Sequence, residues 1–281
     1  MGVVLALCAA VGYGASDFVA GLLSRRVSSY AVAVVAQIAA ASAVVLAAAL
    51  LPAAHPSGAN LAWGAVSGIG NGLGTAFLYR GFGSGRMSVV APLSAVGAAG
   101  LPVLVGVALG DRPSTLMIVG IVLALPAIAL ISRPPGRQAL DGQPAGRAGV
   151  LDGLLAGAGF ALLFVALGRV PTEAGLWPLA LGQIAATPTV VLAALLARGT
   201  LRAPLRAAGG AVVVGLLGAA ATLLYLLAAQ RQLLSVAAVV TSLYPALTVL
   251  AAMVVLREHV GRGQALGLAA AVVAVTLITL G

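Results

Sequence analysis

Gln-Ile-Ala-Ala at residues 37–40 returns at residues 183–186, and each copy leads into a Val-Val-Leu-Ala-Ala run, at 44–48 and 190–194. The two copies are separated by 146 residues. Further matches have an offset of 147: Thr75, Ser88, Asp111 and Gly120 correspond to Thr222, Ser235, Glu258 and Gly267. A gap of a single residue therefore superposes the two halves. In an apolar chain, two equivalent halves are typical of secondary transporters, whose substrate site lies between the repeats near the bilayer midplane.

The composition is that of a protein dissolved in lipid. Hydrophobic residues make up 62% of the 281 residues and charged residues only 7%, whereas soluble domains have about 25% charged residues. The net charge of +9 comes entirely from arginine. Because these arginines stand singly or in small groups between apolar runs, they indicate membrane topology and not a nucleic-acid partner. We expect a multi-pass protein of the cell inner (plasma) membrane.

The N-terminal apolar stretch is expected to be a retained span and not a cleaved signal peptide. It has no basic segment before it, and Asp17 lies within it. Cys8 is the sole cysteine, so no disulfide can form within the chain.

Charged residues, prolines and glycines divide the chain into ten apolar stretches, each close to the roughly 20 residues that a membrane span needs. They run approximately over residues 3–23, 30–51, 61–79, 88–109, 115–132, 150–168, 176–197, 209–228, 233–256 and 264–280. All are expected to be helices, because lipid offers no partner to an unpaired backbone amide.

The segment 133–149 is rich in proline, glycine and charge, which predicts a linker between a first repeat at 1–132 and a second at 150–281. Five spans is an odd number, so the second repeat enters the membrane from the opposite side. The predicted fold is an all-α integral membrane protein with ten transmembrane helices, arranged as two inverted five-helix repeats around a central cavity.

The orientation in the membrane stays open. Twelve of the 15 arginines fall in loops on one side of the predicted membrane, and three, Arg112, Arg169 and Arg231, fall on the side of the termini. The positive-inside rule therefore favours termini outside the cytoplasm. The family resemblance described below implies cytoplasmic termini.

Asp17 is the candidate functional residue with the clearest chemistry. A charge near the centre of a span costs roughly 2.5–3.5 kcal/mol on insertion scales, and such residues usually face a cavity or a partner. A carboxylate there could bind a cationic group or take up a proton. The alternative is that Asp17 reaches the nearby interface or pairs with Arg25 or Arg26.

Polar and aromatic residues in other spans are candidates for the lining of a solute path. Gln37 and Gln183 are equivalent in the two halves, and each could either line a cavity or bond across helices as packing contacts. The remaining candidates are Tyr13, Asn71, Tyr225 and Tyr244. We expect no cofactor and no metal, because no phosphate-binding loop and no cluster of metal ligands occurs in the sequence.

Three glycines spaced by four, Gly64, Gly68 and Gly72, place a groove on one face of the third span. Such a groove permits close helix–helix approach. It could serve packing within one monomer, a homodimer face or a moving helix, so the sequence is compatible with a monomer or a homodimer.

Several of these segments resemble the EamA-type members of the drug/metabolite transporter superfamily. The stretch Gly-Tyr-Gly-Ala-Ser-Asp-Phe at 12–18 is similar to that family's aromatic-Gly-Ser-Asn-Phe motif, and Ser-Leu-Tyr-Pro-Ala-Leu at 242–247 leads to Glu258 and Gly267 with its spacing. The resemblance covers essentially the whole chain. It implies ten helices, inverted repeats, a central cavity, and export or uptake of small metabolites by alternating access.

The first half departs from this pattern. Gly97-Ala98 stands where Tyr244-Pro245 would recur, and Asp111 replaces a glutamate. These departures weaken any inference about the substrate.

The sequence thus predicts a secondary active transporter of a small organic metabolite or drug-like solute, with proton coupling through Asp17 as an option. A passive channel or lipid scramblase is the alternative. A membrane-embedded enzyme is less favoured, because the serine-protease-like Gly83-Ser84-Gly85 turn needs a general base and the two histidines, His55 and His259, lie in loops.

Overall fold

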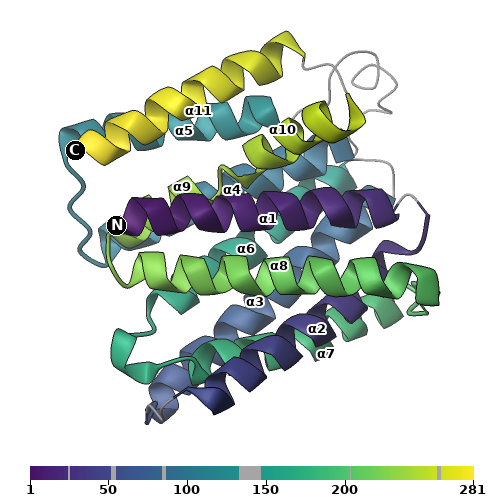
Figure 1. The fold of residues 1–281 in the computed structure, drawn as a ribbon. Coiled ribbons are helices and arrows are strands. Elements are labelled where there is room, and N and C mark those ends of the chain that lie inside the picture. Colours follow the sequence, from purple (N-terminus) through teal and green to yellow (C-terminus); the bar gives the residue numbers. More distant parts are fainter. Residues whose placement is uncertain (25, 52–54, 84–86, 133–146, 203, 258–260) are drawn as a thin grey trace.

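The computed structural model describes residues 1–281 except 25, 52–54, 84–86, 133–146, 203 and 258–260 (Figure 1). In this described part the chain forms eleven α-helices and one short 3-10 helix, η2 (Thr172–Ala174), with no strand. The α-helices are α1 (Gly2–Ser24), α2 (Ser29–Leu50), α3 (Gly58–Gly83), α4 (Met87–Ala108), α5 (Thr115–Ile131), α6 (Arg147–Gly168), α7 (Trp177–Leu196), α8 (Leu205–Ala229), α9 (Leu234–Thr241), α10 (Tyr244–Leu256) and α11 (Arg262–Leu280).

The helices are apolar enough for a membrane protein. Seven stretches of helix are long and hydrophobic enough to cross a bilayer, and Leu93–Ala108 and Thr115–Ile131 are shorter apolar helices. Each predicted span overlaps one of the observed helices, with ends that differ by a few residues. Most of the predicted linker at 133–149 lies outside the described residues.

The ninth predicted span, 233–256, is long and apolar enough to cross a bilayer over Leu234–Val255, but it is not one continuous helix. It is broken between Thr241 and Tyr244, so that α9 and α10 follow one another with Ser242 and Leu243 between them. Pro245 stands in the first turn of α10. Since proline has no N–H and its ring collides with the carbonyl four residues earlier, a continuous helix is disfavoured at this point and a new helix is favoured.

The two chain termini lie at the same end of the bundle, which we call the terminal face (Figure 1). The opposite end, where α1 ends and α8 begins, is the arginine-rich face. Its described arginines are Arg26, Arg80, Arg198, Arg202, Arg206, Arg257 and Arg262, all exposed.

Helix contacts come in pairs that correspond through the offset between the halves. α1 packs against α8, and its counterpart α6 packs against α3. In the same way α8 packs against α2 where α3 packs against α7, and α1 packs against α9 and α10 where α6 packs against α4. α5 packs against α11, each helix being the counterpart of the other.

The contact between α5 and α11 repeats atom for atom. A Cβ added to Gly120 would lie 2.8 Å from the carbonyl oxygen of Ala274, and one added to Gly267 would lie 2.9 Å from that of Ala127. Both pairs are related by 147 residues. Gly120 and Gly267 therefore lie at equivalent positions on the two helices of a single interface.

The glycine groove of α3 serves packing within the chain. Added Cβ atoms at Gly64 and Gly68 would collide with the carbonyl groups of Pro178 and Gly182 on α7, and one at Gly72 would lie 2.5 Å from Thr189. The counterpart of Gly68 is Gly215, whose added Cβ would collide with the carbonyl of Ala36 on α2. Small residues thus allow the close backbone contact that holds helices together in lipid.

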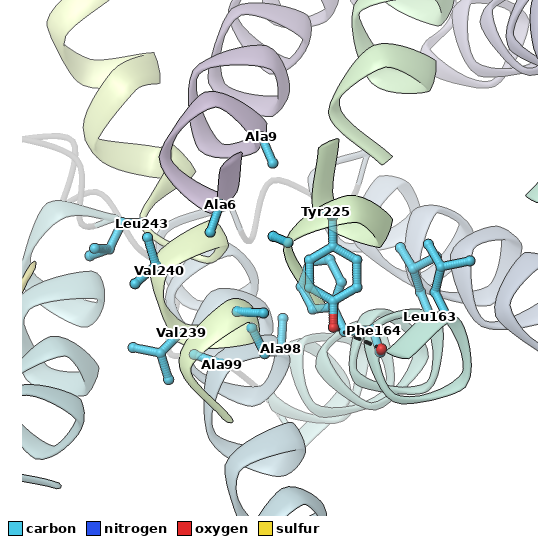
Figure 2. Packing of buried hydrophobic residues seen from close by; sticks show 14 of the residues in the cluster. Ala6, Ala9, Ala98, Ala99, Leu163, Phe164, Tyr225, Val239, Val240 and Leu243 are labelled. Atoms are coloured by element: carbon cyan, nitrogen blue, oxygen red, sulfur yellow. Dashed lines mark hydrogen bonds between the residues drawn. The ribbon is translucent and has the colours of Figure 1, made fainter. Parts of the chain in front are cut away.

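The buried core lies where helices of both halves meet (Figure 2). Alanines of α1 and α4 pack there against valines of α9, and Tyr225 of α8 packs beside Phe164 of α6. This core occupies the middle of the bundle and supports the residues described next.

Candidate functional site

Asp17 lies on the inner side of α1. Ala6, Ala10, Tyr13 and Asp17 are spaced by four, three and four residues, and at roughly 100° per residue they form one stripe. Ala6 and Ala10 are fully buried, Tyr13 is half-buried and Asp17 is exposed. The side chains that face outward, Val4, Cys8 and Val11, lie roughly opposite. The exposed surface at Asp17 therefore belongs to an opening inside the bundle.

This opening widens toward the arginine-rich face. Gly14 packs tightly on α10, since a Cβ added to it would lie 2.5 Å from Leu247 and 2.7 Å from the carbonyl oxygen of Tyr244. Two turns later, an added Cβ on Gly21 would meet no atom of the described residues within 4 Å. α1 and α10 thus diverge beyond Gly14, and we call the space beside Asp17 and Gly21 the vestibule.

Asp17 has no hydrogen bond or ion pair within the described part of the chain. Arg26, one of the two arginines that could have neutralised it, makes no ion pair there either, and Arg25 lies outside the described residues. Asp111 accepts a hydrogen bond from the backbone N–H of Ser235 at 2.9 Å, and Asp152 pairs with Arg80. The first of these carboxylates therefore caps α9, and the second joins α3 to α6.

Tyr13 connects the stripe on α1 to α8 and α10. Its hydroxyl is 2.9 Å from the Thr222 hydroxyl, which also donates to the Gly218 carbonyl at 2.8 Å. The Tyr13 ring lies 6.2 Å from the ring of Tyr244 and 6.4 Å from that of Phe164, between centroids. Two predicted tyrosines therefore stand together, one turn of helix from Asp17.

Gln37 and Gln183 meet across the contact of α2 with α7. The Gln37 amide donates to Oε1 of Gln183 at 2.6 Å and to its backbone carbonyl at 3.3 Å. Gln183 is buried, with 4% of its surface exposed. The equivalent glutamines thus bond to one another where the two halves meet.

A small cavity of about 10 Å³ lies beside this pair. Its lining includes Ser67, Asn71, Gln183 and Thr222, which come from α3, α7 and α8. A space of this size holds about one water molecule. Polar groups of both halves therefore converge at the centre of the bundle, and two of the predicted residues, Asn71 and Gln183, are among them.

Tyr225 is a supporting residue in this arrangement. It is fully buried, and its hydroxyl donates to the Phe164 carbonyl at 2.8 Å (Figure 2). The two rings pack at 4.5 Å between centroids with an interplanar angle of 39°. The hydroxyl hydrogen of Tyr225 is therefore already bonded to an acceptor within the protein.

The second half carries no counterpart of the acidic opening. In α1 the offset is again 147, since Gly12 packs on Ala221 as Gly159 packs on Gly74. Residues 13 and 17 therefore correspond to Phe160 and Phe164, and Phe164 is only 3% exposed. Gly168, the counterpart of Gly21, is closed off: a Cβ there would lie 2.6 Å from Leu234. Among the described residues, α1 is therefore loosely packed at Gly21, whereas α6 is closely packed at Gly168.

Sequence reasoning did not single out every polar group of this region as a site residue. The Ser67 hydroxyl, which lines the small cavity, donates to the Gly64 carbonyl at 2.7 Å. Ser242, at the break between α9 and α10, is fully buried and its hydroxyl has no partner within the described residues. The available signal for Ser242 was its position just before Tyr244-Pro245. Where the helix breaks there, Ser242 becomes a buried polar residue at the C-terminal end of α9.

A larger cavity of about 310 Å³ lies at the terminal face. It is bounded by the ends of α2 and α8 and by the start of α7, with Trp177, Thr172 and Gln230 in its lining. None of the seven predicted side chains contributes to it in the part of the chain that the structure describes.

Other chemistries find little support among the described residues. No group of three or more His, Cys, Asp or Glu side chains that could hold a metal ion occurs there. Ser84 and His259, on which the enzyme alternative rests, lie outside the described residues.

Comparisons with known proteins agree with this architecture. The model of the EamA-like transporter family matches residues 1–133 and 147–280. A solved crystal structure aligns with a TM-score of 0.75 and 18% sequence identity, over 99% of this chain and 96% of the other. At this identity the likeness shows the fold alone. No curated protein matches the chain.

Proposed function

The chain belongs to the EamA-like transporter family, and from this premise we propose that it moves a small organic solute by secondary active transport with alternating access. Membership itself makes it a multi-pass membrane transporter of the drug/metabolite transporter superfamily. The proposal adds that the ten spans, with α9 and α10 as one broken span, form two inverted repeats joined by the linker at 133–149. It places the protein in the inner (plasma) membrane.

The observation that carries the proposal is the different state of two equivalent positions. A Cβ on Gly21 would meet no described atom within 4 Å, while one on Gly168, its counterpart 147 residues later, would pack against Leu234. In an inverted repeat, equivalent positions on the first helices of the two halves lie at opposite membrane faces. One open and one closed position is the arrangement expected of a transporter in a single access state.

The proposed solute site extends from the vestibule to the small central cavity. Asp17, Tyr13 and Tyr244 stand at the vestibule, and Asn71 and Gln183 line the cavity, with Gln37 bonded to Gln183. Tyr225 holds Phe164 in place behind them. Exchange between access states would open a path beside α6 and close the one beside α1.

Labelling of single cysteines tests this proposal and separates it from a passive channel. In a Cys8→Ala background, Gly21→Cys and Gly168→Cys are matched positions, and each is exposed in reconstituted vesicles to a membrane-impermeant maleimide. We expect Gly21→Cys to react from the arginine-rich face and Gly168→Cys to react only from the terminal face. A cross-link that holds α1 against α10 is expected to slow the first reaction and speed the second.

A channel gives a different result. If both cysteines react at once and the cross-link leaves Gly168→Cys unchanged, a continuous path exists and alternating access is wrong.

A further inference from the structure

We infer that the solute of this transporter is an organic cation, held by the Asp17 carboxylate with the rings of Tyr13 and Tyr244 beside it. The inference rests on the proposed function and names the substrate class of the same site. It follows from the charges that remain unmatched inside the bundle.

The other described carboxylates are engaged or peripheral. Asp111 caps α9, Asp152 pairs with Arg80, with Nε to Oδ1 at 2.7 Å, and Glu173 is exposed on η2 at the terminal face. Asp17 alone among them opens to the interior without a protein partner. A carboxylate within a span is costly unless a counter-charge or a proton accompanies it.

No described basic side chain is placed to supply that counter-charge from inside the bundle. Every described arginine lies in a loop or in the first or last turn of a helix, and the chain contains no lysine. The polar groups that line the small cavity, such as Asn71, Gln183 and Thr222, are uncharged. Since no described side chain supplies this charge, we assign it to a ligand or to a proton.

The aromatic surroundings favour an organic cation over a small inorganic one. Tyr13 stands one helical turn before Asp17 on the same stripe, and its ring is 6.2 Å from that of Tyr244 at an interplanar angle of 59°. Tilted rings beside a carboxylate offer π faces to a substituted ammonium group. The second half has Phe160 and Phe164 at the equivalent positions, so at this site only the first half contributes a carboxylate.

Binding of a graded series of cations tests the inference on the full chain in detergent. The probes are choline, benzyltrimethylammonium and tetraphenylphosphonium, measured by calorimetric titration. Their controls are 3,3-dimethylbutan-1-ol, a neutral isostere of choline, and tetraphenylborate, an anion of the same shape as the phosphonium. The variants are Asp17→Asn, Asp17→Glu and, as a control acid away from the vestibule, Glu173→Gln.

We expect at least one cation to bind the wild-type protein, with its neutral or anionic counterpart much weaker. Asp17→Asn is expected to weaken that binding by about ten-fold or more, because it removes the negative charge opposite the ligand. Asp17→Glu and Glu173→Gln are expected to retain it.

Three results would overturn the inference: no wild-type binding of any of the three cations, equal binding of cation and matched control, or unchanged affinity in Asp17→Asn. The last result would assign Asp17 to a proton or to a structural role.

Flux measured in proteoliposomes separates this inference from the proposed function. Cation binding that depends on Asp17 without solute counterflow would contradict transport and leave the cation site standing. Counterflow of a neutral or anionic solute that survives Asp17→Asn would do the reverse.

Discussion

Gln37 and Gln183 show how a pair of equivalent residues can hold the two halves together while one of them also lines a cavity. Their side chains are 2.6 Å apart, and Gln183 also lines the small cavity. The repeated Gln-Ile-Ala-Ala predicted two glutamines at equivalent places but left open whether they line a cavity or bond across helices. The structure gives Gln183 both contacts.

The pair can be tested by a double-mutant cycle. Replacement of either glutamine by leucine is expected to lower the free energy of unfolding, because the remaining amide is left without its partner. The double variant is expected to lose less than the sum, with a coupling energy of about 0.6 kcal/mol and at most roughly 1.7 kcal/mol, as for other hydrogen bonds between membrane helices. Unfolding in mixed micelles measures each variant. Strictly additive losses would mean that the 2.6 Å contact contributes no interaction energy.

Tyr225 and Tyr244 illustrate what sequence could not separate. Both are tyrosines in apolar spans of the second half, and both were predicted to contact solute. The structure buries Tyr225 fully and ties its hydroxyl to Phe164, whereas Tyr244 lies half-buried beside Tyr13. The burial of each tyrosine depends on which helix faces its ring. Tertiary contacts decide this, and the local sequence pattern does not show it.

At the scale of helices, the contact of α8 with α2 depends on the absence of a side chain. A Cβ on Gly215 would collide with the carbonyl of Ala36, while one on Gly209, in the first turns of the same helix, would meet nothing within 4 Å. Their counterparts on α3 include Gly68, which is equally close to α7.

Substitution by alanine should therefore separate the two glycines of α8. We expect Gly215→Ala to destabilise the protein by more than 1 kcal/mol, because two backbones must move apart, whereas Gly209→Ala is expected to be neutral or to stabilise by up to about 1 kcal/mol through helix propensity. Thermal unfolding of the detergent-solubilised variants measures both. Equal effects of the two substitutions would contradict the packing described for α2 and α8.

The helix break at residues 242–243 was the main difference between the predicted and observed elements. Hydropathy places a span over 233–256 but does not show whether its helix is continuous. Proline at the first turn of a helix is well accommodated, so the chain starts a new helix there instead of bending an old one. Pro92 and Pro102 in α4, Pro126 in α5 and Pro188 in α7 lie inside helices that continue without interruption.

At the scale of the molecule, the offset of 147 residues predicted two equivalent halves and matched Gly120 with Gly267. The structure places these two glycines at equivalent positions of the α5–α11 contact, which the repeat alone did not predict. The offset could not predict that Gly168 is closely packed and Gly21 is not. That difference depends on how the two halves pack against each other, which a sequence repeat does not specify. Likewise, the sequence alone could not show toward which side of the bundle α1 turns the face that carries Asp17.

Paired distance measurements test the central claim, that two inverted repeats exchange access between the two faces, most directly. Spin labels at Gly21 and Val255 report the separation of α1 from α10 at the arginine-rich face, and labels at the equivalent residues Gly168 and Ala108 report the separation of α6 from α4 at the terminal face. In a Cys8→Ala background in lipid nanodiscs, we predict two populations for each pair. Conditions that lengthen the first distance must shorten the second. A single fixed distance for both pairs, or changes in the same direction, would contradict the account.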